Sequence, residues 1–80
     1  MGMLIEKEIT LNSMKTGEGG IVIRIDGGHH MVERLAALGI RPGKRVTKVS
    51  SMFMKGPVTI QIDEAQVAIG YRMAGKIIVE

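Results

Sequence analysis

Residues 26–43 read Asp26-Gly-Gly-His-His-Met-Val-Glu-Arg-Leu-Ala-Ala-Leu-Gly-Ile-Arg-Pro-Gly43, and this stretch predicts the only long helix of the chain. Met31, Leu35 and Leu38 lie at positions i, i+4 and i+7, so their large apolar side chains share one face of a helix. The remaining positions of the stretch are mostly polar or small. This periodicity is typical of an amphipathic helix that packs against a core with one side.

The two ends of this helix are set by glycine, proline and a short polar side chain. Gly39 can adopt the left-handed conformation that ends a helix, and Ile40 can then fold back onto the last turn. Pro42 prevents the helix from resuming, and Asp26 is the expected N-terminal cap. We therefore expect an α-helix over about residues 28–38.

Most of the remaining chain has the alternation of β-strands. Ile21, Ile23 and Ile25 are predicted to share one face of a strand, with Arg24 and Asp26 on the other. Further short strands are expected within residues 9–14, 44–51, 58–62, 67–69 and 76–80, with a hairpin turn at Asp63-Glu64 and a single helical turn near residues 71–74. Five or six short strands in an open sheet would expose their edges, so we expect a mostly β fold, a closed or nearly closed small barrel with one inserted helix.

The composition fits one small domain over residues 1–80. Of the 80 residues 45% are hydrophobic, but only Phe53 and Tyr71 are aromatic, so the core must come from aliphatic side chains and methionine. The chain has no cysteine, which excludes disulfides and thiolate zinc sites and suits a reducing cytoplasm. Met3-Leu4-Ile5 is too short for a signal peptide or a membrane span, so we expect a cytoplasmic protein that does not insert into the membrane.

The charge distribution favours a solvated surface over a nucleic-acid footprint. The formal net charge is +3, and the densest basic cluster consists of Lys44, Arg45 and Lys48. Single-strand binders stack bases on aromatic side chains, which this chain lacks almost entirely. No nucleic-acid partner is therefore expected.

Metal binding and catalysis have few candidate residues. His29, His30 and Glu33 are the weak candidates for a divalent metal, because His29 and Glu33 lie at i and i+4 on the predicted helix. Two such ligands leave a site incomplete, since structural zinc takes four protein ligands and catalytic zinc takes three. The glycines do not have the spacing of a phosphate-binding loop, and no catalytic constellation is evident. We expect no cofactor beyond a weakly held divalent ion, and no enzymatic activity.

The segment Met52-Phe53-Met54 is an apolar cluster in a predicted loop. Met14, Met31 and Met73 fall at apolar positions of the pattern and are expected to fill the core. The loop cluster either folds over the barrel as a lid or presents an apolar patch to a partner. Both interpretations remain open at the level of sequence.

Several segments together resemble the FeoA family, small accessory proteins of bacterial and archaeal ferrous iron uptake. The resemblance covers about residues 9–79 and is strongest where three motifs occur in order: Leu38-Gly39-Ile40-Arg41-Pro42-Gly43, Gly56-Pro57-Val58 and Ala68-Ile69-Gly70. Further matching segments are residues 11–23, 27–28, 34–35, 67–74 and 76–79. Thr16 stands where the family often has proline.

The resemblance implies an SH3-like barrel with an inserted helix and a specific partner. That partner is the cytoplasmic G domain of FeoB, a membrane transporter, whose assembly or regulation the family is thought to support. Arg34 and Arg41 are candidate arginine fingers for this GTPase, although surface pairing or solvation of these side chains is the simpler interpretation. The candidate partner-binding residues are Met52, Phe53, Met54, Arg34, Arg41 and Lys44.

One other interpretation remains. The C-terminal domain of DtxR-type metal-dependent repressors is also SH3-like, so the chain could be a stand-alone regulatory module of that kind. The 80 residues hold no helix-turn-helix, which favours the transport accessory. Formation of a homodimer is left open.

Overall fold

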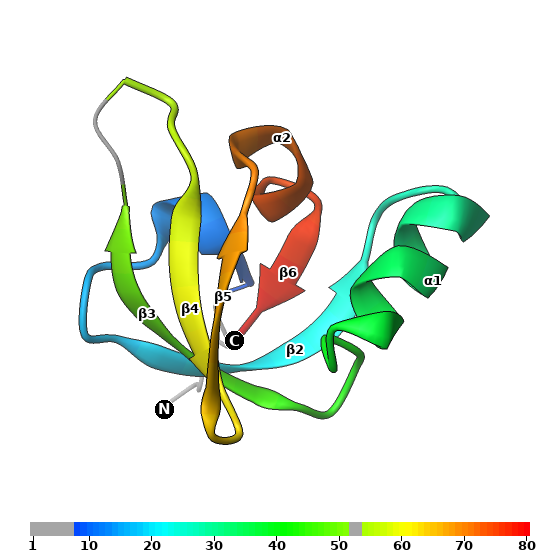
Figure 1. The fold of residues 1–80 in the computed structure, drawn as a ribbon, viewed down its shortest axis with the longest axis horizontal. Helices are drawn as coiled ribbons and strands as arrows, with labels where there is room; N and C mark the ends of the chain where they lie inside the picture. Colours follow the sequence, from blue (N-terminus) through cyan, green and yellow to red (C-terminus); the bar gives the residue numbers. More distant parts are fainter. Residues whose placement is uncertain (1–7, 52–53) are drawn as a thin grey trace, which may run out of the picture.

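The computed structural model describes residues 8–51 and 54–80, which form one curled antiparallel sheet with two helices (Figure 1). Along the chain these elements are β1 (Ile9–Thr10), the 3₁₀ turn η1 (Leu11–Ser13), β2 (Gly19–Ile25), α1 (His29–Ala37), β3 (Arg45–Ser51), β4 (Val58–Ile62), β5 (Ala65–Ile69), α2 (Tyr71–Ala74) and β6 (Ile77–Val79). The strand order is β1-β6-β2-β3-β4-β5. This confirms the predicted fold, a mostly β small barrel with one inserted helix and one helical turn.

Two β-bulges bend the sheet, and the first lies in the strand β2, where one prediction was wrong. The pairing of β2 with β6 shifts between Val22 and Arg24, and the pairing of β3 with β4 shifts between Lys48 and Ser50. Such bulges bend a strand and increase its twist. Ile21, Ile23 and Ile25 were predicted to share one face of the strand, but of the three only Ile25, which follows the bulge, packs against the core. Val22 is fully buried instead, and the three isoleucines are only half-buried.

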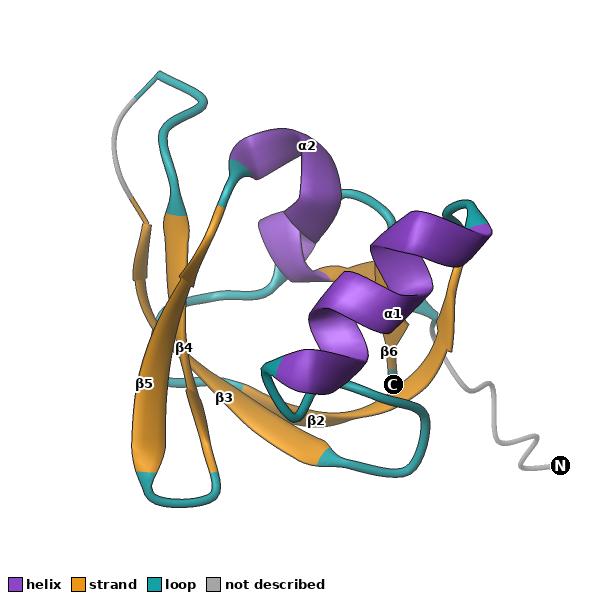
Figure 2. Cartoon of the chain, turned by 45° about the vertical axis from the view of Figure 1, so that its right-hand side comes forward, coloured by secondary structure: helices purple, strands orange, loops and turns teal. Residues whose placement is uncertain are grey.

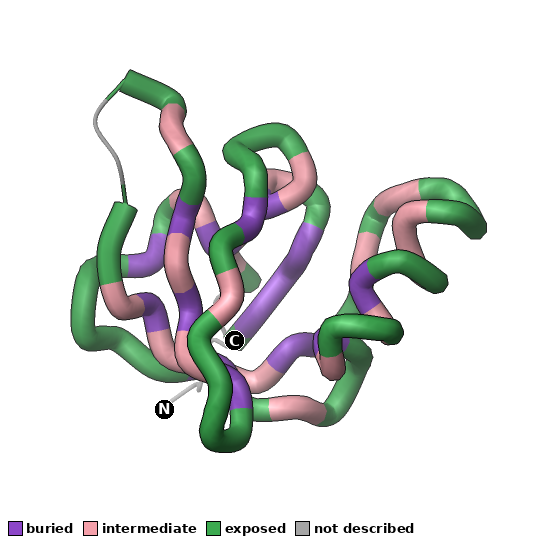
Figure 3. The backbone as a smooth tube through the Cα atoms, in the orientation of Figure 1, coloured by how far each residue is buried: buried purple, intermediate pink, exposed green. Residues whose placement is uncertain are grey.

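The core is aliphatic, as the composition requires. It lies inside the curled sheet and draws on every strand except β1 (Figure 3). Its buried members are Leu11, Met14, Val22, Leu35, Ile40, Val46, Val58, Ile60, Ile62, Ile69, Ala74, Ile77 and Val79. Met14 is therefore a core residue as predicted, while Met31 and Met73 pack against the core from its edge.

Helix α1 lies beside the barrel and is attached to it by a narrow contact. Leu35 is its only fully buried residue, Met31 is half-buried, and Leu38 remains 44% exposed, so the predicted apolar stripe buries only its middle (Figure 3). At the start of α1, a Cβ atom on Gly27 would collide with the side chain of Met31. The close passage from β2 into the helix therefore leaves room for a side chain at position 27 only if the Met31 side chain moves.

The end of α1 confirms the prediction, and its start does not. Gly39 has φ +90°, and the Ile40 amide donates to the Leu35 carbonyl at 2.9 Å, which brings the fully buried Ile40 back onto the helix. The N-cap is Gly28, without a side-chain hydrogen bond. Asp26, the predicted cap, accepts instead from the Arg24 guanidinium at 3.0 Å.

The second half of the chain follows its prediction closely. β4 and β5 pair as a hairpin from Ile62–Ala65 to Val58–Ile69, and Asp63 takes a positive φ of 54° in the turn. After β5, α2 leads into β6 (Figure 2). In the sheet, β6 lies between β1 and β2. In the part of the chain that the structure describes, no helix is long and apolar enough to cross a membrane.

Candidate functional site

A groove between the two helices collects chemically distinctive side chains. His30, Met31 and Arg34 line it from α1, and Arg72 and Met73 line it from α2, around a volume of about 320 Å³. Figure 2 shows the two helices on the same side of the curled sheet. The groove is therefore lined by two thioether side chains, two guanidinium groups and an imidazole.

The two arginines of this groove have no carboxylate beside them, unlike Arg24 and Lys44. Arg34 and Arg72 are exposed, and neither has an acidic oxygen within 4.0 Å among the described residues. Lys44, by contrast, donates to Asp63 at 2.8 Å. The groove is therefore a site of uncompensated positive charge.

Arg24 shows what a paired guanidinium looks like in this protein. It donates to Glu8 at 2.8 Å and to Asp26 at 3.0 Å. These hydrogen bonds, that to Glu8 first, raise the pKa of the Arg24 side chain above its ordinary value. Its charge is satisfied within the protein, which leaves it no role in an anion site.

Lys48 is buried, which the sequence did not indicate. Its Nζ donates to the carbonyl oxygens of Leu11, Asn12 and Met14 at 3.1, 3.2 and 2.8 Å, and the residue is 3% exposed. Desolvation lowers the pKa of the ammonium group, and the charge of Glu18 partly opposes this shift. Lys48 thus closes the C-terminal end of η1 from inside the barrel, where it is not available to a partner.

The predicted basic cluster is therefore not a surface cluster. Lys48 is buried, Lys44 is paired with Asp63, and of its three members only Arg45 is exposed without an acidic partner among the residues described. Buried lysines are rare unless they are paired. The sequence does not indicate that Lys48 is buried, because position 48 looks like one member of a basic strand.

The weak metal candidates lie at the exposed start of α1. His29 Nε2 lies 3.1 Å from Glu33 Oε2, both side chains are mostly exposed, and the His29 and His30 rings meet edge to face with centroids 6.2 Å apart. Across residues 8–51 and 54–80, no group of three or more His, Cys, Asp or Glu side chains is placed to hold a metal ion. The His29–Glu33 pair offers two metal ligands at most.

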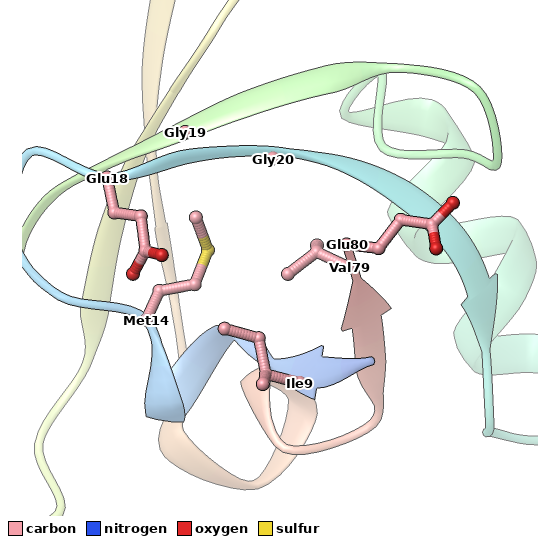
Figure 4. Close-up of a pocket in the computed structure, with 7 residues that line it drawn as sticks. All are labelled: Ile9, Met14, Glu18, Gly19, Gly20, Val79 and Glu80. Carbon is pink, nitrogen blue, oxygen red and sulfur yellow. The ribbon is translucent and has the colours of Figure 1, made fainter. Parts of the chain in front are cut away.

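A second hollow lies at the C-terminal end of β6. Ile9, Met14 and Val79 point into a volume of about 440 Å³, with Glu18 beside Met14 and the Glu80 carboxylate directed away from it (Figure 4). Its walls are core side chains seen from the edge of the barrel, and the Glu18 carboxylate already accepts from the Lys15 amide at 2.8 Å. We regard the groove between α1 and α2 as the better candidate site.

The predicted partner-binding residues do not form one surface. Met54 is 80% exposed in the β3–β4 loop, whereas Arg34 lies on α1 on the opposite side of Figure 1. Met52 and Phe53 lie outside the described residues. Arg41 is exposed just after α1, and Lys44 is paired with Asp63.

The groove brings Arg34 together with residues that the sequence analysis missed. Arg72 and Met73 come from a helical turn 38 positions further along the chain, and no local spacing links them to α1. The available signal was weak: a methionine and an arginine side by side in a predicted turn.

Comparison with known proteins gives a consistent result. The FeoA domain family matches residues 9–80. A protein of Methanocaldococcus jannaschii named as an Fe(2+) transport protein A is 38% identical over 66 residues, which cover 82% of this chain and 78% of the relative.

Solved structures agree in fold. The crystal structure of an iron uptake regulatory protein (FeoA) is 33% identical, covers 94% of this chain and 97% of its own, and superposes with a TM-score of 0.84. A manganese-dependent transcriptional repressor is 29% identical, with a TM-score of 0.82, over 90% of this chain and 40% of the repressor. The same barrel therefore occurs both as a separate chain and as part of a larger regulator.

Proposed function

Because the chain belongs to the FeoA family of ferrous iron transport proteins, we propose that it is an accessory protein that binds the cytoplasmic G domain of a FeoB-type transporter. The observation that carries this proposal is the family match over residues 9–80. The proposal places the protein in the cytoplasm, at the inner face of the membrane through its partner. The family is one of transport accessories and not a known enzyme family.

The surface of the protein supports a docking role. Met54 projects from the β3–β4 loop with 80% of its surface exposed, and Arg34 and Arg72 carry charge that no carboxylate of the described residues neutralises. Exposed apolar side chains and unpaired arginines are typical of interaction surfaces. Their separation allows contact with a partner at more than one point.

Binding to the isolated G domain tests the proposal. We expect the purified chain to bind the G domain of the FeoB-type transporter from the same genome in isothermal titration calorimetry, with and without GTP. An unrelated small GTPase is the control. A chain that binds neither nucleotide state of the G domain, or that binds both GTPases equally, would remove this function.

GTP hydrolysis tests a finer mechanism. If Arg34 or Arg41 acts as an arginine finger, the chain raises the hydrolysis rate of the G domain by orders of magnitude, and replacing that arginine with alanine abolishes the effect. Binding without acceleration would leave the docking role and exclude the arginine finger.

A second candidate function is supported by the likeness to the repressor. The chain corresponds to 40% of the manganese-dependent repressor at 29% identity, so it could act as a separate regulatory module that binds a DtxR-type repressor. Calorimetry with the repressor of the same genome discriminates the two proposals. Binding to the repressor and not to the G domain would favour this second function.

A further inference from the structure

We propose that the groove between α1 and α2 binds an acidic segment of a partner protein in which one large apolar side chain is flanked by Asp or Glu residues. The groove consists of His30, Met31, Arg34, Arg72 and Met73. This inference deepens the proposed function, and rests on it in so far as the transporter G domain is the protein that carries the segment.

The floor of the groove suits a single apolar side chain. Met31 and Met73 are half-buried and pack against the core, so each is held on one side and open on the other. Methionine is unbranched and polarisable, and it adapts to ligands of different shape. A volume of about 320 Å³ is at the small end of ligand pockets, which favours one inserted side chain over a cofactor.

The rim of the groove suits carboxylates. Arg34 and Arg72 approach the groove from different helices, and neither is paired with a carboxylate among the described residues. A guanidinium binds a carboxylate with two parallel hydrogen bonds, which fixes the direction of the incoming segment. The imidazole of His30 lines the groove beside them and can donate a hydrogen bond to an acceptor.

Nucleic acid fits the same groove less well. Phosphates could pair with Arg34 and Arg72, but no aromatic side chain lines the groove to stack a base. The two methionines would then stay uncovered. An apolar anchor between two acidic residues uses all the chemistry present.

The direct test is a titration of the ¹⁵N-labelled chain with the peptide acetyl-Glu-Glu-Leu-Glu-Glu-amide, followed by NMR. We expect the largest shifts at the backbone amides that line the groove. A peptide with glycine in place of leucine should bind about tenfold more weakly, because it buries no apolar side chain. Equal affinity of the two peptides, or shifts confined to another surface, would overturn the inference.

Charge reversal tests the rim. The double variant Arg34→Glu with Arg72→Glu should bind the leucine peptide at least about tenfold more weakly. Arg45→Glu is the matched control, because Arg45 is exposed on β3 and also has no acidic partner in the described part of the chain. Thermal unfolding verifies that each variant is folded, and Arg72→Gln, with an expected loss of about threefold, replaces the double variant if that fails to fold.

Two further arms separate this inference from the proposed function. If the G domain binds the wild type and the double variant equally, the groove is not the docking site and the accessory function stands. If the leucine peptide binds the groove and the G domain does not bind at all, the accessory function fails and the groove specificity stands. Tighter binding of a dT₁₀ oligonucleotide than of the leucine peptide at the groove would assign the site to nucleic acid and overturn the inference.

Discussion

The side chain of Lys48 connects two parts of the chain that are far apart in sequence. Three carbonyl oxygens in and just after η1 accept from its Nζ, although β3, the strand that carries Lys48, starts more than 30 residues later. A buried ammonium is destabilising unless its hydrogen bonds are made, and here all three are made within the protein. Lys48 therefore links β3 to the η1 turn through hydrogen bonds inside the barrel.

The variant Lys48→Met tests this role. Methionine fills the same space without a donor, so buried carbonyl groups lose a partner and the free energy of unfolding should fall by about 1–3 kcal/mol. Urea denaturation at pH 7 measures the loss, with Lys76→Met, at an exposed lysine, as the control that stays within about 0.5 kcal/mol of wild type. A Lys48→Met protein as stable as wild type would mean that these hydrogen bonds give no net stabilisation.

The same side chain predicts an alkaline pH dependence. Because burial lowers the pKa of Lys48 below the ordinary value of 10.5, the unfolded chain binds more protons than the native chain just below pH 10.5. The free energy of unfolding of the wild type should therefore rise with pH relative to that of Lys48→Met, until both states of Lys48 are neutral above pH 10.5. Denaturation curves of the two proteins between pH 7 and pH 11 measure this difference. A difference that is constant over the whole range contradicts the buried charge.

Gly39 is the residue at which backbone conformation decides the path of the chain. Its φ is +90°, and an added Cβ would meet only the Ile62 side chain at 3.9 Å, so the constraint on position 39 is torsional and not steric. Gly39→Ala should lower the free energy of unfolding by about 1–2 kcal/mol. Gly28→Ala, at φ −74° in open space, should change it by about 0.5 kcal/mol or less, because a less flexible unfolded chain offsets the poorer cap. Equal losses of unfolding free energy for Gly39→Ala and Gly28→Ala would argue against a left-handed backbone conformation at position 39.

At the scale of elements, α1 has a single fully buried residue. Leu35 is fully buried, whereas Leu38 on the same predicted stripe is 44% exposed. Leu35→Ala should lower the free energy of unfolding by about 2–5 kcal/mol through the cavity it leaves. Leu38→Ala should change it by about 0.5 kcal/mol or less, which places the two variants well apart in a urea melt. Similar losses for both would show that α1 packs with its whole stripe.

The elements that sequence predicted best are those defined by local geometry. Helix α1 was expected over residues 28–38 and spans His29–Ala37, since periodicity and Gly39 act within a few residues. The prediction that Ile21, Ile23 and Ile25 share one face of β2 was wrong. The pairing of β2 with β6, more than 50 residues later, shifts after Val22, and nothing local in the sequence indicates this shift. Asp26 was misassigned for a similar reason, since Arg24 competes for its carboxylate.

The candidate site was only partly predictable for the same reason. Arg34 was recognised as a candidate from its place on the helix, but Arg72 and Met73 join it only when α2 packs near α1. Long-range contacts of this kind leave no periodic signal. The burial of Lys48 likewise depends on carbonyl groups from a distant turn.

At the scale of the whole molecule, the order of the strands makes the C-terminus central. The last strand, β6, lies between β1 and β2, and its residues Ile77 and Val79 are buried in the core. The backbone of Glu80 also exchanges two hydrogen bonds with Ile21, at 2.9 and 3.0 Å. The N-terminal and C-terminal parts of the described chain therefore meet in one sheet, so local contacts alone cannot complete the barrel.

A chain that ends at Gly75 should consequently fail to fold. It retains the paired strands β2 to β5 but loses the strand that joins β1 to β2, together with the core side chains of Ile77 and Val79. A chain of this size has little core to lose before folding fails. We expect no cooperative transition in thermal circular dichroism and a collapsed ¹H–¹⁵N spectrum. The full-length variant Ile77→Ala is the graded control, since it leaves the strand in place and should still unfold cooperatively, with a free energy lower by about 2–5 kcal/mol. A truncated chain with a dispersed spectrum would mean that β2 to β5 form an independent unit, and that the meeting of the two termini is a consequence of folding and not a requirement for it.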